Sequence, residues 1–288
     1  MWKHNHAGGD RAPSPVWQGC LASADEREAA MAPARSAEKS LAATEEGVTA
    51  VSDPTVSVIM AVKNGARFLG AAIDSVLAQE LRPSEIVVVD GGSEDDSVSI
   101  ARSYPAVRVV PQTGTGIASA YNTGIDVTSG DLLAFLSSDD LWTPDKLSAQ
   151  VGFLRPCPQV QYVTARVRFF LEPGCAVPPG FRRALLEGDH VGHIMETLLA
   201  RRAVFDLVGR FDPRLSTGED VDWFARAHDL GVHHAVVERV LLHKRVHDRN
   251  LSLCDAESNR NLLDVVKRSL DRKRERFVQA PPNGDRLR

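Results

Sequence analysis

Several features of common protein classes are missing from this sequence of 288 residues. Its 4 cysteines (Cys20, Cys157, Cys175, Cys254) lie far apart and form no Cys-x-x-Cys pair, which argues against a disulfide scaffold and a zinc site. No run of about 18 apolar residues occurs, so no transmembrane segment is predicted. Charged and small residues interrupt the N-terminal region, so no signal peptide is predicted either. These absences favour a soluble protein of the reducing cytoplasm.

An excess of positive charge is also missing. Lys and Arg number 34 against 38 Asp and Glu, for a net charge of -4, and no basic stripe crosses the central region. Proteins that bind duplex nucleic acid usually carry such an excess, so no nucleic-acid partner is expected. A P-loop is absent, and Lys63-Asn64-Gly65 stands where a dinucleotide-binding Gly-x-Gly-x-x-Gly would follow the first strand. A nicotinamide enzyme is therefore disfavoured.

The chain divides into three regions by composition. Residues 1–52 are rich in Ala, Ser, Glu, Pro and Gly without a lasting apolar period, and are predicted to form a disordered tail. Residues 53–257 have the pattern of one folded domain, within a chain that is 43% hydrophobic and 25% charged. Residues 258–288 are predicted to form a basic C-terminal helix and a tail.

The folded region alternates short apolar runs with segments of helical period. Runs at 56–62, 85–90, 107–110 and 132–136 predict buried strands, and the segments between them predict helices. Such alternation implies right-handed crossovers and an α/β fold with a mainly parallel sheet flanked by helices. In these sheets ligands bind at the carboxyl ends of the strands.

Carboxylates are predicted at that edge of the sheet. Asp90 ends the second apolar run, and Asp139-Asp140 follow the fourth. Two charges at the rim of a buried strand need a compensating cation, and hard oxygen ligands suit Mg²⁺ or Mn²⁺ shared with a substrate phosphate. Capping of the following helix by one Asp is the structural alternative.

A second group of candidates lies near the end of the domain. Glu219-Asp220 begin a predicted helix, where carboxylates also favour the helix dipole, so a catalytic role and a structural one are both open. Trp223, one turn further, suits either stacking on an acceptor sugar or the core. His247 could bind a metal ion or a diphosphate as a neutral imidazole, although packing of a loop is the favoured interpretation.

Five motifs in order resemble a family 2 glycosyltransferase over about residues 54 to 252. They are Val56–Val62 with Ser75–Gln79, Glu85–Asp95, Gly116–Ile125, Ser129–Asp140, and Phe211–Pro213 with Gly218–Trp223. The resemblance implies the GT-A fold, with a smaller acceptor-side region, and inverting, metal-assisted transfer of a sugar from a nucleotide-diphosphate donor. No Gln-x-x-Arg-Trp motif follows Asp220, which indicates a non-processive enzyme.

The resemblance also assigns roles to residues. It gives Asp220 the role of general base with Glu219 beside it, and Asp140 the role of metal ligand, with His247 as a second candidate. Trp223 is placed toward the acceptor, a saccharide, lipid-linked or other hydroxyl compound. The residues placed at the nucleotide are Val62, Asp90, Gly92, Asn122 and Asp139.

Two alternatives remain open at this stage. One is a non-catalytic protein of the same fold that binds a nucleotide sugar or a partner, and the other is a nucleotidyltransferase, which also needs paired carboxylates. The predicted C-terminal helix, from Asn259 to Val278, carries Leu262, Leu263, Val266 and Leu270 on one face, and these would dock on the domain. Its arginines and lysines most simply face solvent, with peripheral contact to anionic lipid at the inner face of the membrane as the alternative.

Overall fold

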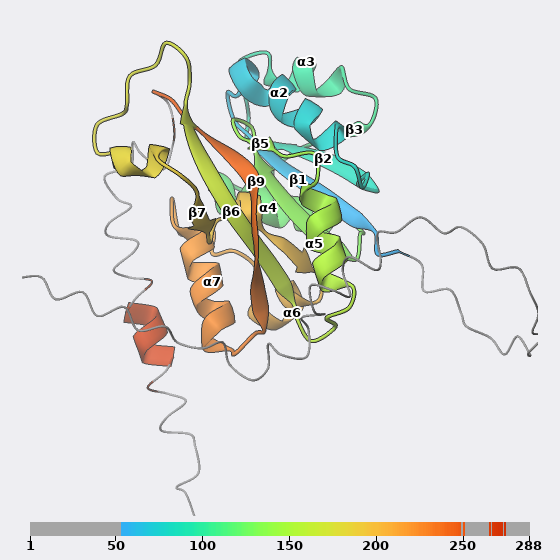
Figure 1. The fold of residues 1–288 in the computed structure, drawn as a ribbon. Helices are drawn as coiled ribbons and strands as arrows, with labels where there is room; N and C mark the ends of the chain where they lie inside the picture. The colour runs from blue at the N-terminus through green and yellow to red at the C-terminus, as the bar shows by residue number, and fades with distance from the viewer. Residues whose placement is uncertain (1–52, 249, 251–264, 266, 273, 275–288) are drawn as a thin grey trace, which may run out of the picture. The chain divides into compact units, whose positions relative to one another are not determined.

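The computed structural model describes residues 53–248, 250, 265, 267–272 and 274 (Figure 1). The strands in these ranges are β1 (Val56–Val62), β2 (Glu85–Asp90), β3 (Val107–Pro111), β4 (Leu132–Ser137), β5 (Leu141–Trp142), β6 (Tyr162–Leu171), β7 (His190–Gly192), β8 (Leu199–Arg201) and β9 (His234–Val246). The helices are α2 (Ala66–Leu77), α3 (Ser97–Arg102), α4 (Gly116–Val127), α5 (Lys146–Leu154), α6 (Val204–Val208) and α7 (Glu219–Asp229), with short 3₁₀ turns η2 (Arg183–Leu186) and η3 (Met195–Thr197). The predicted tail, 1–52, lies outside the described residues.

The strands of the described residues form one mixed sheet. Its order is β3-β2-β1-β4-β8-β6-β9-β5, with β7 paired to β6. The neighbours β3, β2, β1 and β4 are all parallel, and every residue of β1 is buried, as its unbroken apolar run predicts. Antiparallel pairing begins at β8, and β6 is again parallel to β9. The predicted fold, a mainly parallel sheet flanked by helices, is confirmed.

Apolar faces on the crossover helices hold them on this sheet. In α2 the buried residues Leu69, Ala72, Ile73 and Val76 recur at helical spacing. On α4, a Cβ added to Gly124 would lie 2.2 Å from the Cγ2 of Ile59 on β1. Only glycine therefore permits this close approach, which fixes the start of α4 at the carboxyl edge of the sheet. In Figure 1, α4 lies behind the sheet and α5 in front of it.

The parallel strands end level with one another. Val62, the last residue of β1, pairs with Asp90, the last of β2, and Ala61 pairs with Ser137, the last of β4. The loops after all three strands therefore open at the same edge, and Asp139 and Asp140 follow directly from it. The predicted meeting of strand ends is confirmed.

The long strand β9 closes the other half of the sheet. It runs from His234 to Val246. Its last three residues pair with Phe169, Phe170 and Leu171 of β6. This end of the strand carries Lys244 to the edge where β4 ends.

The described part of the C-terminal helix docks through polar contacts as well as an apolar one. Val265 is 1% exposed, while Arg268 donates to Asp212 at 2.9 Å and Arg272 to Asp229 at 2.8 Å. Of the predicted docking residues, Leu262, Leu263 and Val266 lie outside the described residues. Leu270 is 51% exposed, so the prediction is wrong for this residue. Contact with anionic lipid stays a prediction. None of the helices in the described ranges has the length and apolarity needed to cross a bilayer.

Candidate active site

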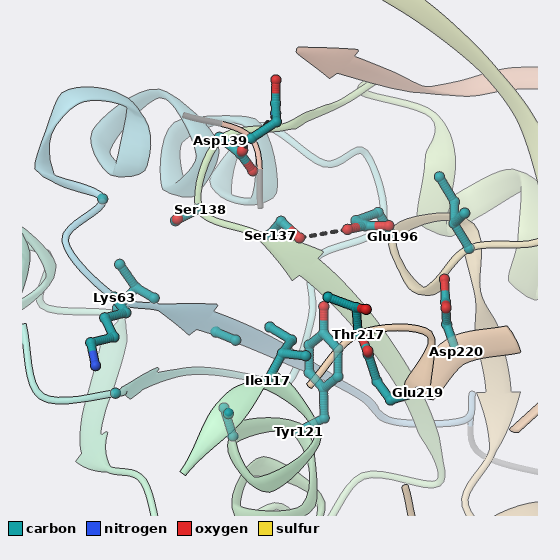
Figure 2. A pocket seen from close by; sticks show the side chains of 18 of the residues that line it. Lys63, Ile117, Tyr121, Ser137, Ser138, Asp139, Glu196, Thr217, Glu219 and Asp220 are labelled. Carbon is teal, nitrogen blue, oxygen red and sulfur yellow. Dashed lines mark hydrogen bonds between the residues drawn. The ribbon is translucent and has the colours of Figure 1, made fainter. Parts of the chain in front are cut away.

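A cavity of about 1010 Å³ opens where the parallel strands end. Val62, Lys63 and Gly91 line one end of it, from the loops after β1 and β2. Asp139 and the turn η3 lie further along, and the first turn of α7 contributes Glu219 and Asp220 (Figure 2). The walls therefore come from both halves of the sheet, and the whole cavity is large enough for a nucleotide-sized ligand.

Asp139 and His247 form a pair on the cavity wall. The Nε2 of His247 lies 3.1 Å from the Oδ2 of Asp139, and the side-chain amide of Asn250 donates to the same oxygen at 3.3 Å. Burial alone would raise the pKa of Asp139, but His247 and the charge of Lys244 hold that pKa below its usual value. His247 itself is packed against the ring of Phe68, with centroids 4.8 Å apart. The pair is thus an anchored carboxylate and imidazole facing the cavity.

This pair fits a divalent ion shared with a substrate. The described part of the chain holds no cluster of three or more His, Cys, Asp or Glu side chains arranged around an ion. Mg²⁺, however, is usually held by one or two carboxylates, with waters and substrate phosphates completing the shell. An oxygen of Asp139 and a nitrogen of His247 are donors of the appropriate kind.

Asp140 points elsewhere. Its side chain is fully buried and absent from the cavity wall. Oδ2 accepts a hydrogen bond from the Nζ of Lys244 at 2.8 Å, and Oδ1 accepts one from the backbone N–H of Arg245 at 2.8 Å. In this arrangement Asp140 binds strand β9, and its predicted role as the metal ligand facing the substrate is not what the geometry favours.

Lys244 and Glu196 belong to the site although sequence reasoning did not select them. Both line the cavity, and the Nζ of Lys244 lies 3.3 Å from the Oε1 of Glu196. Ser137 donates its hydroxyl to the same oxygen at 2.5 Å (Figure 2). Burial alone would lower the pKa of Lys244, but Asp140 and Glu196 raise it well above the usual value, so the ammonium is charged. The available signal for Glu196 was its position as a single charge inside the apolar run Ile194–Leu199, whereas Lys244 stands beside Arg245 in a mixed segment and gave no such signal.

The first turn of α7 brings two carboxylates to the opposite wall. Gly218 precedes it with a φ of 79°, a left-handed conformation that favours glycine. Burial raises the pKa of Glu219 to about 8, and the neighbouring Asp220 adds to the shift. Burial, with the charge of Glu196, raises the pKa of Asp220 to about 6. Asp220 is therefore a carboxylate at neutral pH that can accept a proton readily.

Trp223 is a core residue. It is 0% exposed, and its ring lies 5.4 Å from that of Tyr162 and 5.0 Å from that of Phe205. Its indole N–H donates to the carbonyl of Gly209 at 3.1 Å. The prediction that it stacks on an acceptor is therefore wrong, and the core interpretation is the correct one. Phe169 and Phe181, whose centroids are 6.0 Å apart, line the cavity instead.

Of the remaining predicted nucleotide residues, one lines the cavity and the other three do not. Val62 lines the cavity, and its carbonyl accepts a hydrogen bond from the N–H of Gly91 at 2.8 Å. Asn122 exchanges hydrogen bonds with the backbone of Phe211, at 2.9 and 3.0 Å, and so links α4 to the segment before α7. Asp90 and Gly92 lie beside the cavity, where the Asp90 carboxylate accepts the N–H of Ser93 at 3.1 Å. Contact of Asp90 with a nucleotide stays a prediction.

Comparison with known proteins places this arrangement in a family. A family model described as "Glycosyl transferase family 2" matches residues 57–204. A glycosyltransferase of Rickettsia typhi is 31% identical over 216 residues, covering 68% of this chain and 65% of the relative. The succinoglycan biosynthesis protein ExoU of Rhizobium meliloti is 31% identical over 214 residues, covering 66% of this chain and 61% of the relative.

Other similar proteins are longer or more distant. Chondroitin synthase of Escherichia coli is 25% identical over 237 residues, and the match covers 79% of this chain but 34% of the synthase. The chain thus spans between about a third and two thirds of the length of these relatives. Among solved structures, S. aureus TarS 1-349 in complex with UDP-GlcNAc has a TM-score of 0.60 at 18% identity, covering 76% of this chain and 66% of TarS. This likeness shows a shared GT-A fold.

Proposed function

Because the chain belongs to glycosyl transferase family 2, we propose that it transfers a sugar from a nucleoside diphosphate donor to a hydroxyl acceptor with inversion. The observation that carries the proposal is the presence of Asp139 and Asp220 on different walls of one cavity (Figure 2). An inverting displacement needs the leaving group on one face of the sugar and a base on the other. These two carboxylates suit the two ends of that reaction.

The nucleotide would lie along the strand ends. Val62, Lys63 and Gly91 would contact the nucleoside, and Asp139 would lie toward the diphosphate. Uridine nucleotides are the first donors to test, because structures of similar fold were obtained with UDP and with UDP-GlcNAc. The acceptor side of the cavity carries Phe169, Phe181 and Arg182, so we expect a hydroxyl compound with an apolar or ring face there.

We also propose that Asp139 and His247 hold Mg²⁺ or Mn²⁺ together with the donor diphosphate. When bound, such an ion neutralises charge on the departing diphosphate. The role that the resemblance gives to Asp140 would then fall to Asp139, whose side chain faces the cavity, while Asp140 fixes Lys244 behind it.

Asp220 would act as the base. The acceptor oxygen attacks the anomeric carbon, the bond from that carbon to the diphosphate oxygen breaks, and the hydroxyl proton passes to Asp220. A pKa of about 6 keeps Asp220 mostly ionised at neutral pH and still basic enough to take the proton. Glu219, with a pKa of about 8, would be mainly protonated there and so is the weaker candidate.

Product analysis tests the proposed function. The full chain is incubated with UDP-, GDP- and dTDP-sugars, Mg²⁺ or Mn²⁺, and a mixture of saccharide acceptors, and the nucleotide products are separated. Release of a nucleoside diphosphate that increases with acceptor supports sugar transfer. Release of pyrophosphate would instead indicate a nucleotidyltransferase. Tight binding of a nucleotide sugar with neither product would indicate a non-catalytic binding protein.

A further inference from the structure

Lys244 is a fixed ammonium group on the wall of the cavity. Its side chain is 20% exposed, whereas the other cations on this wall, Lys63, Arg67 and Arg182, are exposed residues. Nζ donates to Asp140 at 2.8 Å and lies 3.3 Å from Glu196. An ammonium group has three N–H donors, so these contacts within the described residues leave one donor for a group in the cavity.

Both partners of Lys244 are themselves anchored. The second oxygen of Asp140 accepts the N–H of Arg245 at 2.8 Å. Glu196 accepts the hydroxyl of Ser137 at 2.5 Å, and its backbone carbonyl accepts the indole N–H of Trp142 at 2.9 Å. The ammonium therefore occupies one position before any ligand arrives, and little side-chain entropy is lost when it binds one. A cation held in this way is preorganised for an anion.

We propose that Lys244 binds the diphosphate of the donor directly and stabilises the nucleoside diphosphate as it leaves. The inference rests on the proposed function and adds a residue to it. When the bond between the anomeric carbon and the diphosphate oxygen breaks, its electron pair stays on that oxygen. Lys244 donates a hydrogen bond to the diphosphate and keeps its proton, while the acceptor proton goes to Asp220. Charge-assisted hydrogen bonds of this kind are about twice as strong as neutral ones.

The carboxylates around Lys244 explain why a buried cation matters at this position. Asp139, Asp140, Glu196, Glu219 and Asp220 all lie in or behind the same cavity. Such a cavity repels a diphosphate unless cations compensate, and a buried cation acts more strongly than an exposed one because water screens it less. Glu196 partly neutralises Lys244, so removal of the Glu196 charge should strengthen anion binding. If Lys244 mediates this effect, Glu196→Gln should tighten binding less in a Lys244→Met background than in the wild-type chain.

Calorimetric titration with UDP, inorganic diphosphate and uridine tests the inference. In excess EDTA we expect Lys244→Met to weaken binding of UDP and diphosphate by about 10- to 100-fold, as expected for loss of a charged hydrogen bond. Lys244→Arg should stay within about threefold of wild type. Uridine, which lacks phosphate, should bind all variants equally. Lys267→Met, an exposed lysine outside the cavity, is the matched control.

Glu196→Gln provides a second variant should Lys244→Met fold poorly. Glutamine keeps an oxygen for Ser137 and Lys244 but removes the charge, so UDP should bind several-fold more tightly in EDTA. Wild-type-like affinity for UDP in Lys244→Met, or no tightening in Glu196→Gln, overturns the inference while leaving the proposed function intact. If neither UDP nor diphosphate binds the wild-type chain even with Mn²⁺, the inference is overturned together with the proposed nucleotide site.

Discussion

Helix α7 carries two sets of carboxylates with opposite surroundings. On its first turn, Glu219 and Asp220 face the cavity and form no ion pair among the described residues. Elsewhere on the helix, the buried Asp222 pairs with Arg226 at 2.8 Å and the buried Asp229 with Arg272 at 2.8 Å. Nearby Asp212 pairs with Arg214 and Arg268. Residues two positions apart on one helix thus belong to a crowded acidic cavity and to a set of carboxylates paired with arginines.

The pKa values separate the two sets. Burial raises the pKa of Glu219 to about 8 and that of Asp220 to about 6, whereas hydrogen bonds from Arg214 hold the pKa of Asp212 well below its usual value. Pairing with arginine stabilises a carboxylate and makes it inert as a base, whereas crowding makes it a proton acceptor near neutral pH. We therefore assign proton transfer to the cavity carboxylates, as proposed for Asp220, and stabilisation of the fold to the arginine-paired ones.

The largest effect should follow Asp220→Asn. The amide keeps the size of the side chain but cannot take a proton, so turnover should fall by about 10² to 10⁴. Affinity for the donor nucleotide, measured by titration, should change little. Asp222→Asn on the same helix is the matched control and should lose stability rather than turnover. Comparable turnover losses in the two variants would show that the two sets of carboxylates do not differ in function.

Arg226→Ala should destabilise the fold by disrupting the arginine-paired set of carboxylates. Arg226 pairs with Asp222, whose side chain is 4% exposed, and donates to the carbonyls of Val208 and Arg210 at 2.6 and 2.8 Å. Loss of one partner of a buried pair leaves the other uncompensated, so the free energy of unfolding should drop by about 2–4 kcal/mol. Urea unfolding measures it. The side chain of Arg274 is 79% exposed and pairs with Asp271. Arg274→Ala should therefore lower the free energy of unfolding by less than about 0.5 kcal/mol.

Glu219→Gln should have a smaller effect, and one that depends on pH. A carboxyl whose pKa rises from 4.5 to about 8 on folding contributes stability below pH 4.5 and loses that contribution as pH rises through 8. Glutamine has no such loss, so the variant should gain about 1 kcal/mol or more over wild type between pH 5 and 9. Thermal melts across that range measure the gain. A constant difference between the two proteins would show that Glu219 ionises as freely as an exposed carboxyl.

The smallest effect is expected from deletion of residues 1–52. Their composition lacks a periodic apolar face, so we expect the deletion to leave both sets of carboxylates unchanged. Melting temperature should shift by no more than about 1–2 °C and turnover should be preserved. A loss of many degrees would show that this segment packs on the domain.

The sequence was most informative where one physical effect dominates. The unbroken apolar runs of β1, β2 and β4 predict buried parallel strands, and the carboxyl-edge rule then brings their ends together. Adjacent residues after a strand end are harder to tell apart. Asp139 and Asp140 have the same chemistry, and only the loop conformation decides that the first faces the cavity and the second faces Lys244.

Long-range pairing explains the rest of what was missed. Glu196 and Lys244 are 48 positions apart. Glu196 is a single charge within an apolar run and Lys244 is one of several charges in β9, so neither forms a motif. Trp223 has the helical position expected of a residue facing the acceptor, but the packing of Tyr162 and Phe205 around it decides its burial. Arginine contacts across the fold likewise hold the C-terminal helix, and they leave Leu270 exposed.

The pH dependence of turnover tests most directly the claim that Asp220 is the base. With saturating donor and acceptor, the account predicts an acidic limb in wild type with an apparent pKa of about 6, below which turnover falls about tenfold per pH unit. Glu219→Gln should keep this limb at the same pH, because a carboxyl with a pKa of about 8 is already uncharged there, and Asp220→Asn should abolish the limb. A limb that disappears in Glu219→Gln and persists in Asp220→Asn would contradict the account and assign the base to Glu219.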